Sequence, residues 1–131
     1  MTVPLSEKLN HCYSLLFSAK LNEERNRFVK ALLCYENCRI ESKKDLSNSV
    51  YTYCFLRSLR KEAQLLLLLG LKRRAYRLLK REYVHVSPLF HSMDKLLVLA
   101  QLHDLSERYS PKESSLFEGL LNQEYSYQAN V

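Results

Sequence analysis

The chain has 131 residues, of which 47% are hydrophobic and 26% charged, and its formal net charge is +6. This composition is typical of one globular domain rather than a disordered chain. Only 2 glycines and 3 prolines are present, which argues against a β-sandwich or barrel and against a glycine-rich phosphate loop. We therefore expect a single helical domain over residues 1–131.

Two helices are predicted in the first third of the chain. Residues from Ser6 to about Lys20 repeat with the helical period, and their apolar stripe is Leu5, Leu9, Cys12, Leu16 and Phe17. Asn22, followed by two acids, is typical of a helix N-cap, so a second helix is expected from there to about Glu41. Its predicted inner face consists of Phe28, Ala31, Leu32, Tyr35 and Cys38.

A third helix is predicted from about Asn48 to Leu69, after a polar loop over Ser42–Ser49. Its core register consists of Phe55, Leu56, Leu59, Ala63, Leu66 and Leu67. The β-branched and aromatic residues of Val50–Phe55 would also suit a strand, but the helix-forming sequence that follows favours a helix. The five leucines Leu65–Leu69 are too few to span a bilayer and predict a core helix buried on several sides. The tyrosines expected in the core are Tyr13, Tyr35 and Tyr53.

Gly70 fits the left-handed end of this helix, and a fourth helix is predicted from Lys72 to about Val84. Its apolar stripe is Leu71, Ala75, Leu78 and Leu79. The segment Glu62–Tyr83 resembles a helical pair of an α-solenoid of the tetratricopeptide or clathrin type, with its small residue, Leu–Gly turn, alanine and paired leucines. The resemblance implies stacked helical pairs, although no second copy recurs at a fixed period.

Two more helices complete the prediction. Ser92 is expected to cap a helix from Met93 to about Tyr109, whose core candidates are Leu96, Leu97, Leu99, Ala100 and Leu105. Ser110, Pro111 and Glu113 form a capping-box pattern for a sixth helix, with Leu116, Phe117, Leu120 and Leu121 as its apolar residues. Residues 122–131 lose the pattern and are expected to fray. The predicted fold is all-α, with about six helices in a compact bundle or a short α-solenoid-like array.

Positive charge is concentrated in the middle of the chain. Between Arg57 and Glu82, nine Lys or Arg residues and two acids give a net charge of +7, against +6 for the whole chain. The candidate partner-binding residues are Lys72, Arg73, Arg74, Arg77, Lys80 and Arg81. Four of them recur at helical spacing on one face, where like charges repel. An acidic protein surface, a phosphate backbone or anionic lipid would relieve that repulsion; the simplest alternative is a solvated surface.

No catalytic site, cofactor or metal site is predicted. Cys34 and Cys38 lie one helical turn apart and could supply two zinc ligands, completed by Cys54 and His11, but the second closely spaced pair typical of structural zinc sites is missing. The cysteines are expected to be reduced and packed, as in an intracellular protein, cytoplasmic or nuclear. Neither a secretory signal nor a transmembrane segment is visible.

The predicted function is a non-catalytic protein–protein interaction module, acting as an adaptor or as one subunit of a larger assembly. Its basic helical face at 72–81 would meet an acidic surface on another protein, or on a second copy of the chain. The alternative is a nucleic-acid-binding protein that contacts phosphates through the same face.

Overall fold

The computed structural model describes residues 5–130, with side chains from Glu7 onward, and this part of the chain contains six helices and no strand. The helices are α1 (Leu5–Glu24), α2 (Phe28–Lys43), α3 (Ser49–Leu68), α4 (Lys72–Tyr83), α5 (Met93–Tyr109) and α6 (Pro111–Ala129). The predicted all-α class is confirmed. The segment Val50–Phe55, for which a strand was the alternative, lies inside α3.

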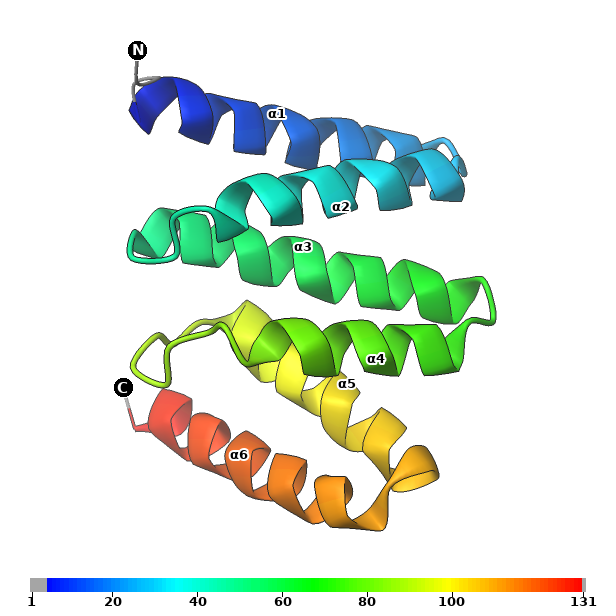
Figure 1. The fold of residues 1–131 in the computed structure, drawn as a ribbon, viewed down its shortest axis with the longest axis vertical. Coiled ribbons are helices and arrows are strands. Elements are labelled where there is room, and N and C mark those ends of the chain that lie inside the picture. Colours follow the sequence, from blue (N-terminus) through cyan, green and yellow to red (C-terminus); the bar gives the residue numbers. More distant parts are fainter. Residues whose placement is uncertain (1–4, 131) are drawn as a thin grey trace.

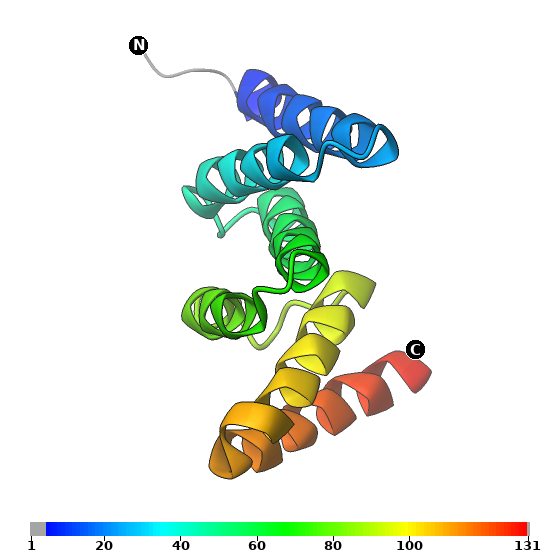
Figure 2. The same cartoon turned by 90° about the vertical axis from the view of Figure 1, so that its right-hand side faces the viewer.

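The helices form an open stacked array in which each helix packs against the next and the chain reverses direction at each turn (Figure 1). Figure 2 shows the resulting zigzag, with α1 and α3 on one side, α2 and α4 on the other, and α5 running obliquely from the α3 side to the α4 side. The central helix α3 packs against α1, α2, α4 and α5, whereas α1 and α6 do not approach one another. Of the two predicted architectures, the α-solenoid-like array therefore describes the chain better than a closed bundle.

The main hydrophobic core surrounds α3. Phe55, Leu56, Leu59 and Ala63 are fully buried and pack with residues of α4, α5 and α6. In the leucine run, Leu65 and Leu66 are buried but Leu68 and Leu69 are exposed at the turn into α4. The leucine run thus begins in the core, as predicted, and ends on the surface.

Most of the predicted helix ends are confirmed. The side chains of Asn48, Ser92 and Ser110 accept hydrogen bonds from the backbone N–H groups that open α3, α5 and α6. Pro111 occupies the first position of α6. Gly70 has a φ of +80°, the left-handed conformation that a glycine adopts at little cost. These ends depend on short-range hydrogen bonds and backbone sterics, which sequence patterns capture well.

The predicted boundary between α1 and α2 is wrong. Asn22 does not cap α2: it lies inside α1, and its Nδ2 donates a hydrogen bond to the Ser18 carbonyl oxygen at 2.8 Å. The chain reverses at Asn26, which has a φ of 58°, and asparagine is one of the few residues other than glycine that tolerates this conformation. Arg27 then precedes α2 and makes no side-chain capping bond.

Residues 122–129 do not fray as expected but continue α6 to Ala129; Val131 lies outside the described residues. The physical reason is Glu124, which is buried and hydrogen bonded to His91 of the loop before α5. Apolar periodicity alone underestimates α6, because its second half is fixed by polar contacts.

Several predicted core residues face solvent. On α1 the aromatic Phe17 is exposed, and the same holds for Leu97 of α5 and Leu116 of α6. On α5 the buried positions next to Leu99 are instead taken by Val98 and Leu102. The side chain of Leu5, also assigned to the α1 stripe, lies outside the described residues. Within the described part of the chain, no helix has the length and apolar character needed to cross a membrane.

Candidate partner-binding site

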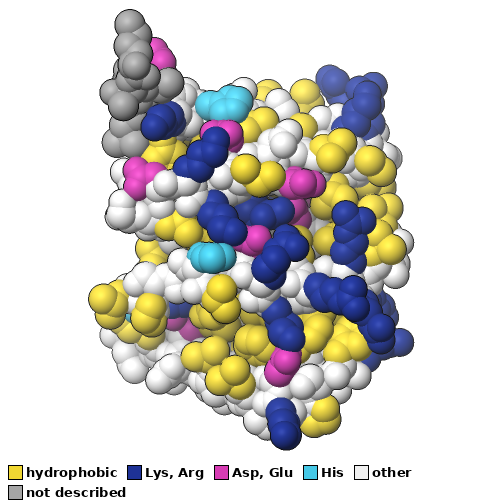
Figure 3. Space-filling view, in the orientation of Figure 1, with side chains coloured by type: hydrophobic (Ala, Val, Ile, Leu, Met, Phe, Trp, Pro, Cys, Tyr) yellow, Lys and Arg dark blue, Asp and Glu magenta, His cyan; other side chains and the backbone are white. Residues whose placement is uncertain are grey.

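The basic residues predicted to bind a partner all lie on α4, a helix anchored by one buried apolar side. Ala75, Tyr76, Leu78 and Leu79 are buried, and the six cations project from the remainder of the helix. Figure 3 shows Lys and Arg side chains (dark blue) gathered across the middle of this face of the molecule, over α2, α3 and α4. The structure therefore brings the cations of α4 together with others from neighbouring helices.

Two of the six cations form ion pairs with acids of the protein itself. The Nζ of Lys80 lies 2.7 Å from Glu113 Oε1 of α6, and the Nε of Arg81 lies 3.1 Å from Glu82 Oε1. Glu113 also accepts a hydrogen bond from the Tyr76 hydroxyl. Its carboxylate therefore faces α4 and does not complete the predicted capping box, because the Ser110 N–H donates instead to the Ser106 carbonyl oxygen.

The other four cations, Lys72, Arg73, Arg74 and Arg77, are exposed and have no ion pair within residues 7–130. The Arg73 guanidinium carbon lies 5.6 Å from the centre of the Tyr109 ring, a cation–π contact that leaves its charge uncompensated. These four residues, here called the α4 basic face, are the part of the predicted site that remains available to a partner.

The α4 basic face lies at the end of the helix where cations are least favourable. Three of its members occupy the first turn of α4, which contains no acid, and Leu71 before them supplies no side-chain cap. The N-terminus of a helix carries a partial positive charge, so this arrangement weakens the helix locally. Residues that break a local stability rule without internal compensation are expected at functional positions.

Beside the basic face, a groove of about 340 Å³ separates α2 from α4. Arg74, Arg77 and Arg81 lie along one wall, and Leu32 and Leu66 supply apolar surface. The opposite wall contributes Glu36 and the buried pair Arg39 and Glu62. The groove thus combines exposed guanidinium groups with apolar contacts, which suits an acidic side chain on an apolar segment.

A buried ionic cluster beneath the groove ties three helices together. Arg39 of α2 donates from Nε to Glu62 Oε2 of α3 at 2.5 Å, and its Nη1 lies 3.1 Å from Glu82 Oε1 of α4. Lys43 also contacts Glu82, at 2.9 Å. Burial acts to raise the pKa of Glu82, but the hydrogen bond from Lys43 and the charge of Arg39 hold it below its ordinary value. Burial raises the pKa of Glu62 to about 7, because Arg39 alone compensates it.

The raised pKa of Glu62 predicts how stability depends on pH. A carboxyl group whose pKa is higher in the folded state stabilises the fold fully below its unfolded pKa, and this contribution is lost as the pH rises through the folded value. Relative to a Glu62→Gln variant, the wild type is expected to lose up to about 3 kcal/mol of unfolding free energy between pH 4.5 and 8. Urea unfolding of both proteins across this range measures the difference; parallel pH profiles would contradict the assignment.

The cysteines do not form the metal site considered from the sequence. Cys38 and Cys54 are buried together with Cys12, whereas Cys34 packs at the edge of a different cluster. No group of three or more metal-ligating side chains occurs in the part of the chain described by the structure. Burial raises the pKa of the Cys38 thiol to about 12 and that of Cys54 to about 11, which disfavours the thiolate needed for metal binding or nucleophilic attack.

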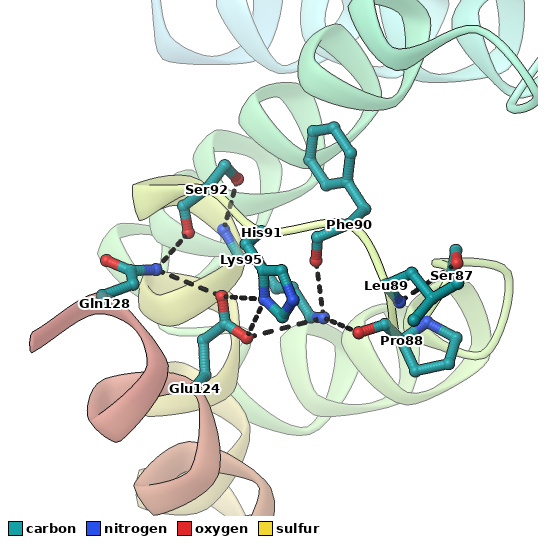
Figure 4. Close-up of polar contacts among 9 residues, drawn as sticks. All are labelled: Ser87, Pro88, Leu89, Phe90, His91, Ser92, Lys95, Glu124 and Gln128. Carbon is teal, nitrogen blue, oxygen red and sulfur yellow. Dashed lines mark hydrogen bonds and ion pairs between the residues drawn. The ribbon is translucent and has the colours of Figure 1, made fainter. Parts of the chain in front are cut away.

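Sequence reasoning missed a second polar cluster, where the loop before α5 meets α6 (Figure 4). Lys95 is buried, and its Nζ donates to the carbonyl oxygen of Phe90 at 2.7 Å and lies 3.6 Å from Glu124 Oε2. Nδ1 of His91 lies 2.9 Å from the same carboxylate oxygen. Because the Lys95 side chain joins the Phe90 carbonyl oxygen of the loop to Glu124 of α6, we interpret the cluster as a clasp between the loop and α6.

The chain is a stacked helical array that carries the α4 basic face. Comparison of the chain with protein-family models, with curated proteins and with solved structures gives no match.

Proposed function

We propose that the chain is a non-catalytic protein–protein interaction module, an adaptor or one subunit of a larger assembly, which binds an acidic surface of its partner through the α4 basic face. One observation carries the proposal: four cations crowd the N-terminal half of α4, and none of them forms an ion pair with an acid among the described residues. A partner carboxylate would supply the missing negative charge at the positive end of the helix dipole.

Apolar surface beside the basic face supports a protein as the partner. Leu68, Leu69 and Leu71 are exposed at the turn that leads into α4. Contiguous exposed apolar side chains next to charged residues are typical of protein interfaces. In this proposal the leucines contribute affinity, and the cations contribute orientation and association rate.

An intracellular location, cytoplasmic or nuclear, is part of the proposal. Its support is the state of the four cysteines, which are all free thiols. Secreted domains of this size commonly pair their cysteines in disulfides, whereas reducing compartments keep them free.

The test is charge reversal of the α4 basic face in a Lys72→Glu/Arg74→Glu/Arg77→Glu variant. The amount of each protein that co-purifies with the tagged wild type from its native cell is expected to fall at least tenfold with this variant. Its melting temperature should stay the same or rise, because the acids suit the helix N-terminus better than the cations they replace.

A Lys8→Glu/Arg27→Glu variant is the matched control, since both residues are exposed on the α1–α2 hairpin and have no ion pair among the described residues. It should retain the partners. Retention by the triple variant would refute the proposal. If the triple variant instead loses a bound nucleic acid, the face would be assigned to phosphates. On duplex DNA the logarithm of the affinity should then fall by about 0.9 per neutralised phosphate for each tenfold rise in salt concentration.

A further inference from the structure

Three aromatic side chains that the sequence places in or beside the core are exposed on the other side of the array. Tyr13 is 48% exposed, Phe17 70% and Tyr53 43%. They line a groove of about 440 Å³ between α1 and α3. An apolar group of this size left open to water is unfavourable in isolation, and such a concave patch is typical of a binding surface.

The same groove is strongly basic. Lys20, Arg57, Arg60 and Lys61 line it, and no acid does. Two acids lie at its margins: the buried Asp94 is shared by Arg57 at 3.3 Å and Arg60 at 2.8 Å, and Glu23 lies 3.3 Å from Lys61. Four cations therefore face two carboxylates, and Lys20 has no ion pair within the described residues.

The aromatic rings and the cations are interleaved. The Arg57 guanidinium carbon lies 5.4 Å from the centre of the Tyr53 ring, a contact that holds both side chains at the groove wall. Leu16 and Cys54 supply further apolar lining. The groove thus offers an apolar surface with positive charge along its edge.

We infer that the α1–α3 groove is a docking site for an acidic peptide segment that carries aromatic or aliphatic side chains. The volume accommodates a few side chains, and the surplus of positive charge selects carboxylates beside them. A single-stranded nucleic acid suits the groove less well, because three of the four cations are already held by Asp94 or Glu23 and a phosphate backbone needs a continuous track of free charge. The inference stands independently of the α4 basic face, which lies on the other side of the array.

A random twelve-residue peptide display library, selected against the full 131-residue chain, provides the test. Enriched peptides are expected to combine Asp or Glu with Phe, Tyr, Leu or Ile. Fluorescence anisotropy of the best peptides should show at least tenfold weaker binding to a Tyr13→Ser/Phe17→Ser/Tyr53→Ser variant. Lys20→Glu should weaken the binding of the same peptides. Circular dichroism should show that both variants remain folded, since the replaced side chains are exposed.

Two controls make the outcome decisive. A Leu33→Ser/Leu116→Ser variant removes exposed leucines outside the groove and should bind normally. The α4 triple variant should also bind normally; peptides lost from it but not from the aromatic variant would support the α4 basic face and refute the groove. Absence of acidic peptides after selection would overturn the inference. So would a labelled twelve-nucleotide oligouridine that binds the chain more tightly than the best peptide and whose binding is lost in the aromatic variant.

Discussion

Replacing Arg39 with methionine is expected to lower the free energy of unfolding by about 3–5 kcal/mol, the usual cost of removing one partner from a buried ion pair. The reason is the burial of Glu62, which is 2% exposed and whose cation contact is Arg39. The substitution destabilises the charged form of Glu82 less, because Lys43 and Arg81 also contact this carboxylate. Urea unfolding at pH 7 measures the loss.

A second substitution separates a specific ion pair from general packing. In an Arg39→Met/Glu62→Gln double variant the uncompensated carboxylate is gone, so most of the lost stability should return. The penalty of Arg39→Met alone should also shrink as the pH falls from 7 toward 4, because protonation of Glu62 in the folded protein removes the buried charge that Arg39 compensates. Strictly additive effects of the two single substitutions would show that Arg39 acts through its methylene groups alone.

The second large effect is expected for Lys95→Met, with a loss of about 3–5 kcal/mol. This substitution leaves Glu124 without its buried cation, and the carbonyl oxygen of Phe90 without its side-chain donor. The loop before α5 and the second half of α6 should loosen together, since the clasp shown in Figure 4 joins them.

Amide hydrogen exchange distinguishes this local effect from a global one. In Lys95→Met, exchange should accelerate more in residues 122–129 than in α3. A Lys95→Met/Glu124→Gln double variant should recover part of the lost stability, because it no longer contains an uncompensated carboxylate. Lys112→Met, at an exposed position of α6, is the control and should leave both stability and exchange unchanged. Equal acceleration throughout the chain would argue against a clasp.

Buried ionic groups support both surfaces that we propose for binding. Arg39 and Glu62 line the groove next to the α4 basic face, and the buried Asp94 holds two arginines at the α1–α3 groove. The helices that carry the two surfaces, α4 and the pair α1 and α3, lie on different sides of the array (Figure 2). A chain that uses both would connect two acidic partners, or two segments of one partner, as expected of an adaptor.

Where the sequence predicted the fold well, the determinants are close in the chain. The caps at Asn48, Ser92 and Ser110 are bonds across two or three residues, and Gly70 sets its own backbone conformation. The failure at Asn22 is instructive, because a cap residue followed by acids also occurs inside helices. The reversal at Asn26 depends on one left-handed residue that composition does not reveal.

The candidate site was only partly predictable for a related reason. The sequence placed six cations on α4, but it could not show that Lys80 meets Glu113, a residue 33 positions away, or that Arg81 contacts the buried Glu82. The remaining face is therefore smaller and nearer the helix N-terminus than the spacing suggested. The aromatic groove was missed because periodicity identifies apolar residues without showing which of them a neighbouring helix covers.

By itself, the sequence determined the number and type of the helices, most of their ends and the concentration of positive charge on α3 and α4, because each depends on local hydrogen bonding, side-chain propensity and composition. Only the tertiary structure decided that Phe17 faces water and that Glu124 is buried in α6. It also decided that, within the part of the chain that the structure describes, no acid pairs with Lys72, Arg73, Arg74 or Arg77. Burial and ion pairing are set by residues far apart in the chain, and the arrangement of the helices brings those residues together or keeps them apart.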